Sequence, residues 1–376
     1  MSDKVANLNE LLNAFNFEGK LANINRINDG HINDTYVFDF TDNKKNHKKY
    51  LVQELNVNVF RKPVDLMNNI IGVTHHLKEK VTECGGDPER ECLYLYPAKD
   101  GKTYFVDTEG RFWRCFNYVY NAHSVQNAQT PEIFAEAARA FGKFQHYLSD
   151  YPIDSLVETI PNFHNTSSRL ADFKQAVNDN KSYRADYCRK EIDFILAREN
   201  DCGVLVKMIE EGKLPLRVTH NDTKLNNVMF DDETNKAICI VDLDTVMPGL
   251  SLYDFGDSIR FGASTAAEDE TDLDKVHFDI DYFRAYADGF ISTAGKSLTR
   301  NEILYLPFSS KLMTLECGMR FLGDYINGDV YFKTDYAEHN LIRARTQLKL
   351  VGEMEEAMPE MEKIISEICE KYGVDL

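Results

Sequence analysis

One polar segment near the middle of the chain contains the residue types that phosphoryl transfer requires. Residues 220–227 are HNDTKLNN, and another aspartate, Asp242, follows Asp222 by 20 residues. Phosphoryl transfer needs an aspartate to accept the proton of the acceptor hydroxyl, oxygen ligands for magnesium, and a cation near the moving phosphate. Asp222 fits the first role and Lys224 the third. Asn227 and Asp242 offer the hard oxygen ligands that magnesium takes.

The spacing of these residues distinguishes them from an ordinary polar turn. Each aspartate follows a short apolar segment, and residues 216–219, 228–230 and 237–241 are predicted strands separated by polar turns. Any one of the polar residues alone would suit a turn between strands. The full H-x-D-x-x-x-x-N pattern followed by Asp242 favours a kinase, in which His220 holds the loop by hydrogen bonding.

The elements that must position this segment change character along the chain. Residues 36–40 and 49–55 have strand-like patterns, and residues 102–107 and 111–116 form a predicted hairpin with Gly110 in its turn. Between these strands, residues 64–80 carry apolar side chains at helical spacing. The amino-terminal part is therefore predicted to be a small antiparallel sheet with one helix.

Beyond residue 120 the pattern is mainly helical. Thr130 and Pro131 form a helix start signal, with threonine as the N-cap and proline in the first turn. Further helices are predicted over residues 186–211, 280–294, 302–325 and 340–372, with Pro307 and Pro359 expected to end or kink the last two. The predicted fold class is α+β in two lobes. The first lobe, residues 1–120, would bind the nucleotide, and the second, residues 121–376, would carry the catalytic loop and the acceptor site.

The segment 220–231 (HNDTKLNNVMFD) and the segment 241–249 (VDLDTVMPG) resemble the aminoglycoside-phosphotransferase and choline-kinase group, which has the protein-kinase-like two-lobed fold. Within that group the chain is most similar to N-acetylhexosamine 1-kinases, a likeness that extends to residues 160–164, 320–325 and 343–347. The resemblance implies an ATP- and Mg²⁺-dependent sugar kinase with Asp222 as general base. It also implies that Asn227 and Asp242 bind magnesium.

The same resemblance suggests where the nucleotide would bind. Residues 29–36 (DGHINDTY) match a phosphate-covering loop of the family, with these candidate contacts: Gly30, His31, Asn33 and Thr35. Tyr118 and Val119 follow the predicted hairpin, where a backbone segment would bind adenine. Protein kinases place a lysine on the third strand, but residues 50–55 contain none, and Glu54 stands where sugar kinases often have a basic residue. Either Lys49 or magnesium with Lys224 would substitute for it.

The acceptor would lie near Asp222 in the helical lobe. By resemblance, Arg320, Asp324 and Tyr331 form part of its wall. Asp244, which lies beside the predicted metal site, is a further candidate contact. Carboxylates and guanidinium groups suit a polyhydroxylated amino sugar because they make directional hydrogen bonds to hydroxyls. An i,i+4 ion pair between Arg320 and Asp324 is an equally simple explanation of that pair. Choline, an aminoglycoside or another sugar remains an alternative acceptor.

Two other motifs compete with the kinase hypothesis. Residues 254–256 read DFG, the metal motif of protein kinases, but Asp254 lies 32 residues past Asp222, and we assign it a structural role. Residues 238–246 (ICIVDLDTV) fit the D-x-D-x-T nucleophile motif of haloacid-dehalogenase-type phosphatases, which would use Asp242. That alternative would leave Asp222 and Asn227 unexplained. A third hypothesis, a nucleotide-binding module without catalysis, rests only on the missing third-strand lysine.

The charge composition of the chain restricts the kinds of molecule that it can bind. The chain has 376 residues with 43 Lys and Arg against 61 Asp and Glu, a net charge of −18. This acidic balance argues against nucleic-acid and anionic-membrane partners, which require a basic surface. No long apolar run or signal-peptide core is evident, and the eight cysteines lack zinc spacing, so we expect a cytoplasmic protein. Carboxylates at the reaction centre would require magnesium beside a triphosphate.

Overall fold

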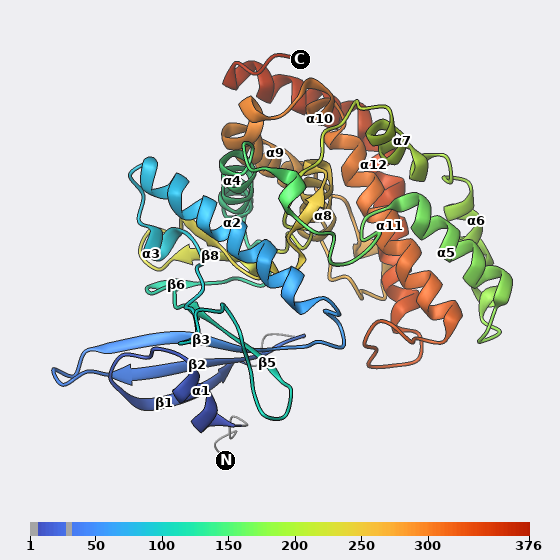
Figure 1. Cartoon of the computed structure of the whole chain (residues 1–376). Coiled ribbons are helices and arrows are strands. Elements are labelled where there is room, and N and C mark those ends of the chain that lie inside the picture. The colour runs from blue at the N-terminus through green and yellow to red at the C-terminus, as the bar shows by residue number, and fades with distance from the viewer. Residues whose placement is uncertain (1–6, 28–31) are drawn as a thin grey trace. The chain divides into compact units, whose positions relative to one another are not determined.

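The computed structural model describes residues 7–27 and 32–376, which form two compact units (Figure 1). The first unit extends to His123 and also includes Asp150–Ile160 and Met229–Met247. The second contains Ser124–Ser149, Pro161–Val228 and Pro248–Leu376. The chain therefore returns to the amino-terminal unit after the HNDTKLNN segment. As a result, Asp222 belongs to the second unit and Asp242 to the first.

An antiparallel sheet in the order β1-β2-β3-β5-β4 organises the first unit, which confirms the predicted amino-terminal sheet. Its strands are β1 (Lys20–Ile27), β2 (Asp34–Thr41), β3 (His47–Leu55), β4 (Phe105–Val106) and β5 (Phe112–Asn117). The middle of β2 buries side chains on both of its faces, including Tyr36, Val37 and Phe38, and such aromatic and β-branched residues favour strands. The apolar cluster against this sheet includes Phe38, Tyr50 and Trp113, all fully buried.

The turn before β5 shows how a local sequence fixes a strand. Gly110 has φ of +81°, in the region that glycine adopts without strain. The Asp107 carboxylate accepts hydrogen bonds from the backbone of Glu109 and Arg111, and from Trp113 Nε1 at 3.0 Å. These bonds hold the indole in the core and the turn that joins β4 to β5, in which Phe105 pairs with Trp113.

Helices and a second small sheet complete the first unit. The helices are α1 (Leu8–Ala14), α2 (Pro63–Glu83) and α3 (Pro88–Glu91). α2 includes the whole of the helix predicted over residues 64–80, and its apolar side chains are buried. A three-stranded sheet in the order β6-β8-β9 contains β6 (Ala122–His123), β8 (Val228–Asp231) and β9 (Ala237–Ile240). β9 leads directly into Asp242.

The second unit is mainly helical, as predicted. Its helices are α4 (Pro131–Tyr147), α5 (Thr166–Asp179), α6 (Arg189–Leu196), α7 (Val204–Glu210), α8 (Ser251–Gly262), α9 (Ile280–Ala294), α10 (Arg300–Leu304), α11 (Leu306–Asn327) and α12 (His339–Tyr372). Thr130 caps α4 as expected, accepting a hydrogen bond from the backbone of Ile133. β7 (Arg217–Thr219) pairs with β10 (Met247–Gly249). Among the described residues, no helix is long and apolar enough to cross a membrane.

Two helix predictions need correction. The helix expected over residues 186–211 is two helices, α6 and α7, because Asn200, Asp201 and Gly203 between them are weak helix formers. Pro359 does not end α12, which continues through it to Tyr372. A proline inside a helix costs about 3 kcal/mol, and the buried side chains on either side of it, including Met354 and Met361, offset that cost by packing.

Candidate active site

The backbone of the HNDTKLNN loop is held by a buried carboxylate on α8. Asp254 is 1% exposed, and its side chain accepts hydrogen bonds from the backbone N–H of His220 at 2.9 Å and of Asn221 at 2.8 Å. Gln145 on α4 donates a third at 2.6 Å. Burial raises the pKa of Asp254, and these donors oppose that shift by stabilising the anion. Asp254 therefore has the structural role expected from its spacing.

The close packing of α8 against α11 explains why residue 256 is glycine. A Cβ on Gly256 would lie 2.4 Å from the main-chain oxygen of Ser309 on α11, a distance that no side chain tolerates. The residue must therefore be glycine for α8 to approach α11 this closely. The DFG sequence thus serves packing and loop anchoring within the second unit.

Three polar side chains predicted from the sequence meet at the end of this loop. Lys224 Nζ lies 2.9 Å from Asp222 Oδ1, and the Asn227 amide nitrogen donates to the main-chain oxygen of Asp222 at 2.8 Å. The Asp222 side chain is 29% exposed, so an acceptor hydroxyl has access to it. Because the amide nitrogen of Asn227 is engaged by Asp222, its amide oxygen can serve as a ligand.

Charge around Lys224 keeps it protonated. Burial lowers the pKa of Lys224, but the carboxylate of Asp222 raises it more, by its charge and by its hydrogen bond, so the pKa lies above the usual lysine value. Asp257 adds negative charge nearby and forms an ion pair with Arg260 at 2.8 Å. Burial raises the pKa of Asp257, but the effect of Arg260 is opposite and larger, so the pKa of Asp257 lies below its usual value.

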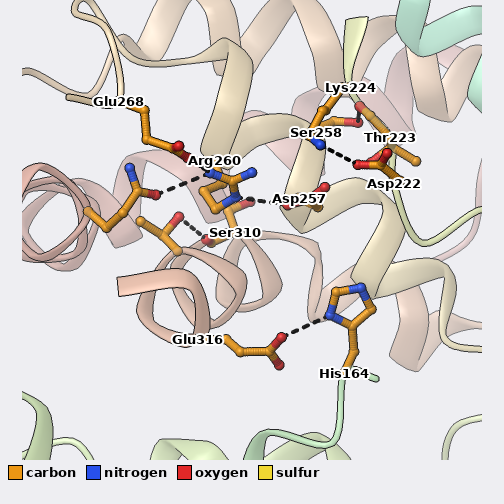
Figure 2. A network of polar contacts seen from close by, with 12 residues as sticks. His164, Asp222, Thr223, Lys224, Asp257, Ser258, Arg260, Glu268, Ser310 and Glu316 are labelled. Atoms are coloured by element: carbon orange, nitrogen blue, oxygen red, sulfur yellow. Dashed lines mark hydrogen bonds and ion pairs between the residues drawn. The ribbon is translucent and has the colours of Figure 1, made fainter. Parts of the chain in front are cut away.

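A second group of buried polar side chains supports the loop from another side (Figure 2). His164 Nδ1 lies 2.9 Å from Glu316 Oε1 on α11, and His164 Nε2 lies 3.4 Å from the main-chain oxygen of Asn221. Asn221 has φ of +62°, a left-handed conformation that asparagine tolerates better than most residues. His164 and Glu316 therefore border the residue that precedes Asp222. No role was predicted for His164, although it lies in the segment 160–164 that resembles the sugar kinases.

The two aspartates after β9 have contrasting environments in the first unit. Asp242 has φ of +62° and is exposed, which suits a ligand for a cation. Asp244 is buried, its Oδ1 lies 2.5 Å from Arg114 Nη1, and its Oδ2 accepts a hydrogen bond from Asn33 at 2.6 Å. Asp244, predicted as an acceptor contact, thus has both oxygens engaged within the first unit.

The predicted nucleotide residues are only partly described. Gly30 and His31 lie outside the described residues. Thr35 accepts a hydrogen bond from Gln53 of β3 at 2.9 Å. Beyond β5, the Tyr118 ring lies 5.1 Å from Lys49 Nζ, and Val119 is buried.

Arg320, Asp324 and Tyr331 share a cavity of about 150 Å³ in the second unit. Arg320 lies within 6 Å of the rings of Phe163, Tyr331 and Phe332. Asp324 forms no ion pair with Arg320 among the described residues, so the simple i,i+4 explanation is wrong. Asp324 instead accepts hydrogen bonds from the backbone of Val330, Tyr331 and Phe332 and from Asn340. Asp324 thus holds the backbone of residues 330–332 and so positions Tyr331, which is 70% exposed, at the cavity.

Arg169 on α5 also lines the cavity and was not predicted. Its guanidinium donates to the main-chain oxygen of Phe163 at 2.8 Å. Burial lowers the pKa of Arg169, and the neighbouring charge of Arg320 lowers it further. Nothing in the local sequence distinguishes Arg169 from the surface arginines of other helices.

Comparison with known proteins shows a family match and similar folds. Residues 106–290 match the phosphotransferase enzyme family. An aminoglycoside phosphotransferase from Alicyclobacillus acidocaldarius has a similar structure over 97% of this chain and 99% of its own, with a TM-score of 0.63 and 12% identity. A spectinomycin phosphotransferase solved with ADP and spectinomycin covers 93% and 97%, with a TM-score of 0.56 and 12% identity. An amicoumacin kinase solved with AMP-PNP, Ca²⁺ and Ami covers 93% and 92%, with the same TM-score and identity.

The solved structures show the fold, and the family match covers part of the chain. The chain has the protein-kinase-like α+β fold, with an antiparallel amino-terminal sheet and a helical carboxy-terminal region, as predicted. The segment that matches the phosphotransferase enzyme family, residues 106–290, contains the HNDTKLNN loop, Asp242 and Asp254. The phosphatase alternative is not supported. That family's motif pattern includes a later acidic motif after a strand, and the residues that imitate it here, Gly323 and Asp324, lie inside α11.

Proposed function

We propose that this protein is an ATP- and Mg²⁺-dependent kinase that phosphorylates the anomeric hydroxyl of an N-acetylhexosamine. One observation carries the kinase part of the proposal. Asp222 is partly exposed, lies 2.9 Å from the protonated Lys224, and is held by Asn227 and by a loop that buried Asp254 anchors. This places a base and a cation together on a rigid frame, as phosphoryl transfer requires.

In the proposed reaction Asp222 accepts the proton of the sugar 1-hydroxyl as its oxygen attacks the γ-phosphorus of ATP. The bond from that phosphorus to the β–γ bridging oxygen breaks, and ADP leaves. Lys224 offsets negative charge on the transferred group. Removing a general base of this kind costs on the order of 10²- to 10⁴-fold in rate.

Asn227 and Asp242 are the proposed magnesium ligands. Amide and carboxylate oxygens are the donors that magnesium prefers, and the exposed Asp242 fits that requirement. When bound, magnesium would neutralise charge on the β- and γ-phosphates. Without such a cation, Asp222 and Asp242 would repel a triphosphate, so we expect activity to require a divalent metal.

The cavity lined by Arg169, Arg320 and Tyr331 supports a polar acceptor. Its guanidinium groups can donate to hydroxyl or acetamido oxygens, and its aromatic rings offer apolar surface to a sugar ring. Two guanidinium groups and two carboxylates line the cavity, those of Arg169, Arg320, Asp172 and Asp324, so it carries no excess of positive charge that would select against a cation. The resemblance of residues 320–325 to sugar kinases is what favours a sugar over choline or an aminoglycoside.

An ATP-consumption screen tests the proposal. The purified protein is assayed with N-acetylglucosamine, N-acetylgalactosamine, their non-acetylated and neutral counterparts, choline and an aminoglycoside, each with Mg²⁺ or EDTA. We expect Mg²⁺-dependent ADP formation with the N-acetylhexosamines and a product whose ³¹P NMR signal is that of an anomeric phosphate. Turnover with choline or the aminoglycoside alone would contradict the sugar assignment. Nucleotide binding without turnover on any acceptor would support the inactive-module hypothesis instead.

A further inference from the structure

The third strand provides no cation for the nucleotide phosphates. β3 includes Lys48 and Lys49 near its start, and both are engaged elsewhere. Lys48 forms an ion pair with Glu18, and Lys49 lies over the Tyr118 ring. Kinases of this fold need a fixed cation beside the α- and β-phosphates, supplied elsewhere by a lysine on this strand.

A buried arginine lies on the neighbouring strand, directly opposite the middle of β3. Arg114 of β5 pairs in register with Gln53 of β3, and directly opposite residues of antiparallel strands project from the same face. Arg114 Nε donates to the Gln53 side-chain oxygen at 3.0 Å. Gln53 in turn donates to Thr35, within the segment predicted to cover the phosphates. The guanidinium is thus joined to that segment by one bridging side chain.

The hydrogen bonding of this arginine is incomplete. Its side chain is 1% exposed and lies against the buried Asp244, with Nη1 2.5 Å from Oδ1. Within residues 7–27 and 32–376, neither of these two atoms makes a hydrogen bond of acceptable geometry. Burying an ion pair is costly unless the remaining donors and acceptors are satisfied, and removing one buried partner is more costly still. Arg114 Nη1 is therefore engaged by an ion pair alone, and its N–H groups can still donate to a ligand.

Asp244 also connects this pair to the predicted phosphate segment. Its second oxygen accepts a hydrogen bond from Asn33, and the Asn33 side-chain oxygen accepts one from the backbone of Asn56. All these residues belong to the first unit. Two routes therefore connect Arg114 with residues 33–35: hydrogen bonds through Gln53, and an ion pair with Asp244 followed by the hydrogen bond from Asn33.

We propose that Arg114 replaces the third-strand lysine and donates hydrogen bonds to the α- and β-phosphates of the bound nucleotide. The inference rests on the proposed function, because it assumes that the first unit binds a nucleotide. Guanidinium is well suited to this role, since its planar N–H groups can contact two phosphate oxygens at once. The sequence signal is a single charged residue in the otherwise apolar segment 112–116 (FWRCF).

Nucleotide titration tests this assignment without any acceptor. The dissociation constant for ADP with Mg²⁺ is measured by calorimetry for wild type, Arg114→Met, Arg114→Lys and the double variant Gln53→Lys/Arg114→Met. We expect Arg114→Met to bind about 10- to 100-fold more weakly, the loss typical of a hydrogen bond to a charged group. The double variant moves the cation across to the third strand, so it should regain part of the affinity.

Arg111→Met is the matched control, because it removes a cation three residues away that pairs with Asp107 at the edge of the sheet. It should bind ADP as wild type does. If Arg114→Met does not fold, Arg114→Lys and the double variant, which keep a cation, decide the question. Wild-type affinity in Arg114→Met, or no recovery in a folded double variant relative to Arg114→Met, overturns the assignment while leaving the kinase proposal intact. Failure of the wild type to bind ADP or AMP-PNP would instead overturn the proposed function.

Discussion

Lys224 Nζ lies 2.9 Å from Asp222 Oδ1, so the proposed base and the proposed phosphate cation form an ion pair with each other. Both side chains extend from one loop, and both are partly exposed. The carboxylate of Asp222 raises the pKa of Lys224 and so keeps Lys224 protonated, the state that it needs before a phosphate arrives. A negatively charged phosphate can then compete with Asp222 for Lys224.

Replacing Asp222 with asparagine should abolish most activity without unfolding the protein. The side chain keeps its size, but an amide cannot accept the acceptor's proton, so kcat should fall by about 10²- to 10⁴-fold. Steady-state kinetics with the best acceptor of the screen would measure this, together with ADP affinity, which should change little. Asp232→Asn, which alters an exposed partner of His123, is the control. Full turnover in Asp222→Asn would exclude its role as base.

Replacing Lys224 with methionine should lower kcat more than it changes the acceptor KM, because the ammonium is proposed to act on the transferred phosphate. The pKa of Lys224 is raised, so the residue stays protonated throughout the pH range of an ordinary assay. We therefore expect no loss of wild-type activity from its deprotonation up to about pH 10. An alkaline decline in wild type that disappears in Lys224→Met would contradict this assignment.

Replacing Glu316 with glutamine should disturb the loop through His164. Glu316 is buried, and a change in its pairing with His164 should cost about 1–3 kcal/mol in the free energy of unfolding. Because His164 also contacts the Asn221 main chain, kcat should fall at temperatures where the variant is fully folded. Urea denaturation and kinetics at low temperature separate the two effects.

The control for that experiment is Glu367→Gln on α12, the same substitution in an exposed ion pair with Arg284. Exposed pairs contribute about 0–1 kcal/mol, so both its stability and its kcat should remain close to those of wild type. If Glu316→Gln loses stability but retains kcat, the pair of His164 and Glu316 supports the fold and has no part in positioning the loop.

The stability of the first unit should depend on pH through Asp107. Although burial raises the pKa of Asp107, hydrogen bonds from the backbone and side chain of Arg111, from Trp113 and from Glu109 lower it more, to about 2. Because its pKa is lower in the folded state, the carboxylate stabilises the fold above about pH 4. That contribution, about 2 kcal/mol, is lost as the pH falls through 2.

Asp107→Asn tests this dependence. The free energy of unfolding of wild type should exceed that of the variant at pH 7, and the difference should shrink as the pH falls below 4. Trp113 is the only tryptophan of the chain and contacts Asp107, so its fluorescence reports unfolding of this unit directly. A difference that is constant from pH 7 to pH 2.5 would contradict the shifted pKa.

Local patterns predicted the elements well where the pattern was strong. The helix over 280–294 and the central strands of the first unit were predicted almost to the residue, because apolar periodicity is a property of neighbouring positions. The prediction of one helix over residues 186–211 was wrong. The surrounding apolar pattern indicated a continuous helix, and it hid the few weak helix formers that divide it. The helix does not end at Pro359, because tertiary packing compensates for the missing hydrogen bond.

The sequence by itself determined the class of chemistry, since Asp222, Lys224 and Asn227 lie within one short loop whose spacing is local. Only the tertiary structure showed that Arg114 faces Gln53 and Asp244, or that Glu316 meets His164 behind the loop. These partners lie far apart in the chain, and their pairing depends on strand register and helix packing. No local periodicity predicts such contacts. The role of each side chain depends on its burial and its partner, and both are established only when the chain folds.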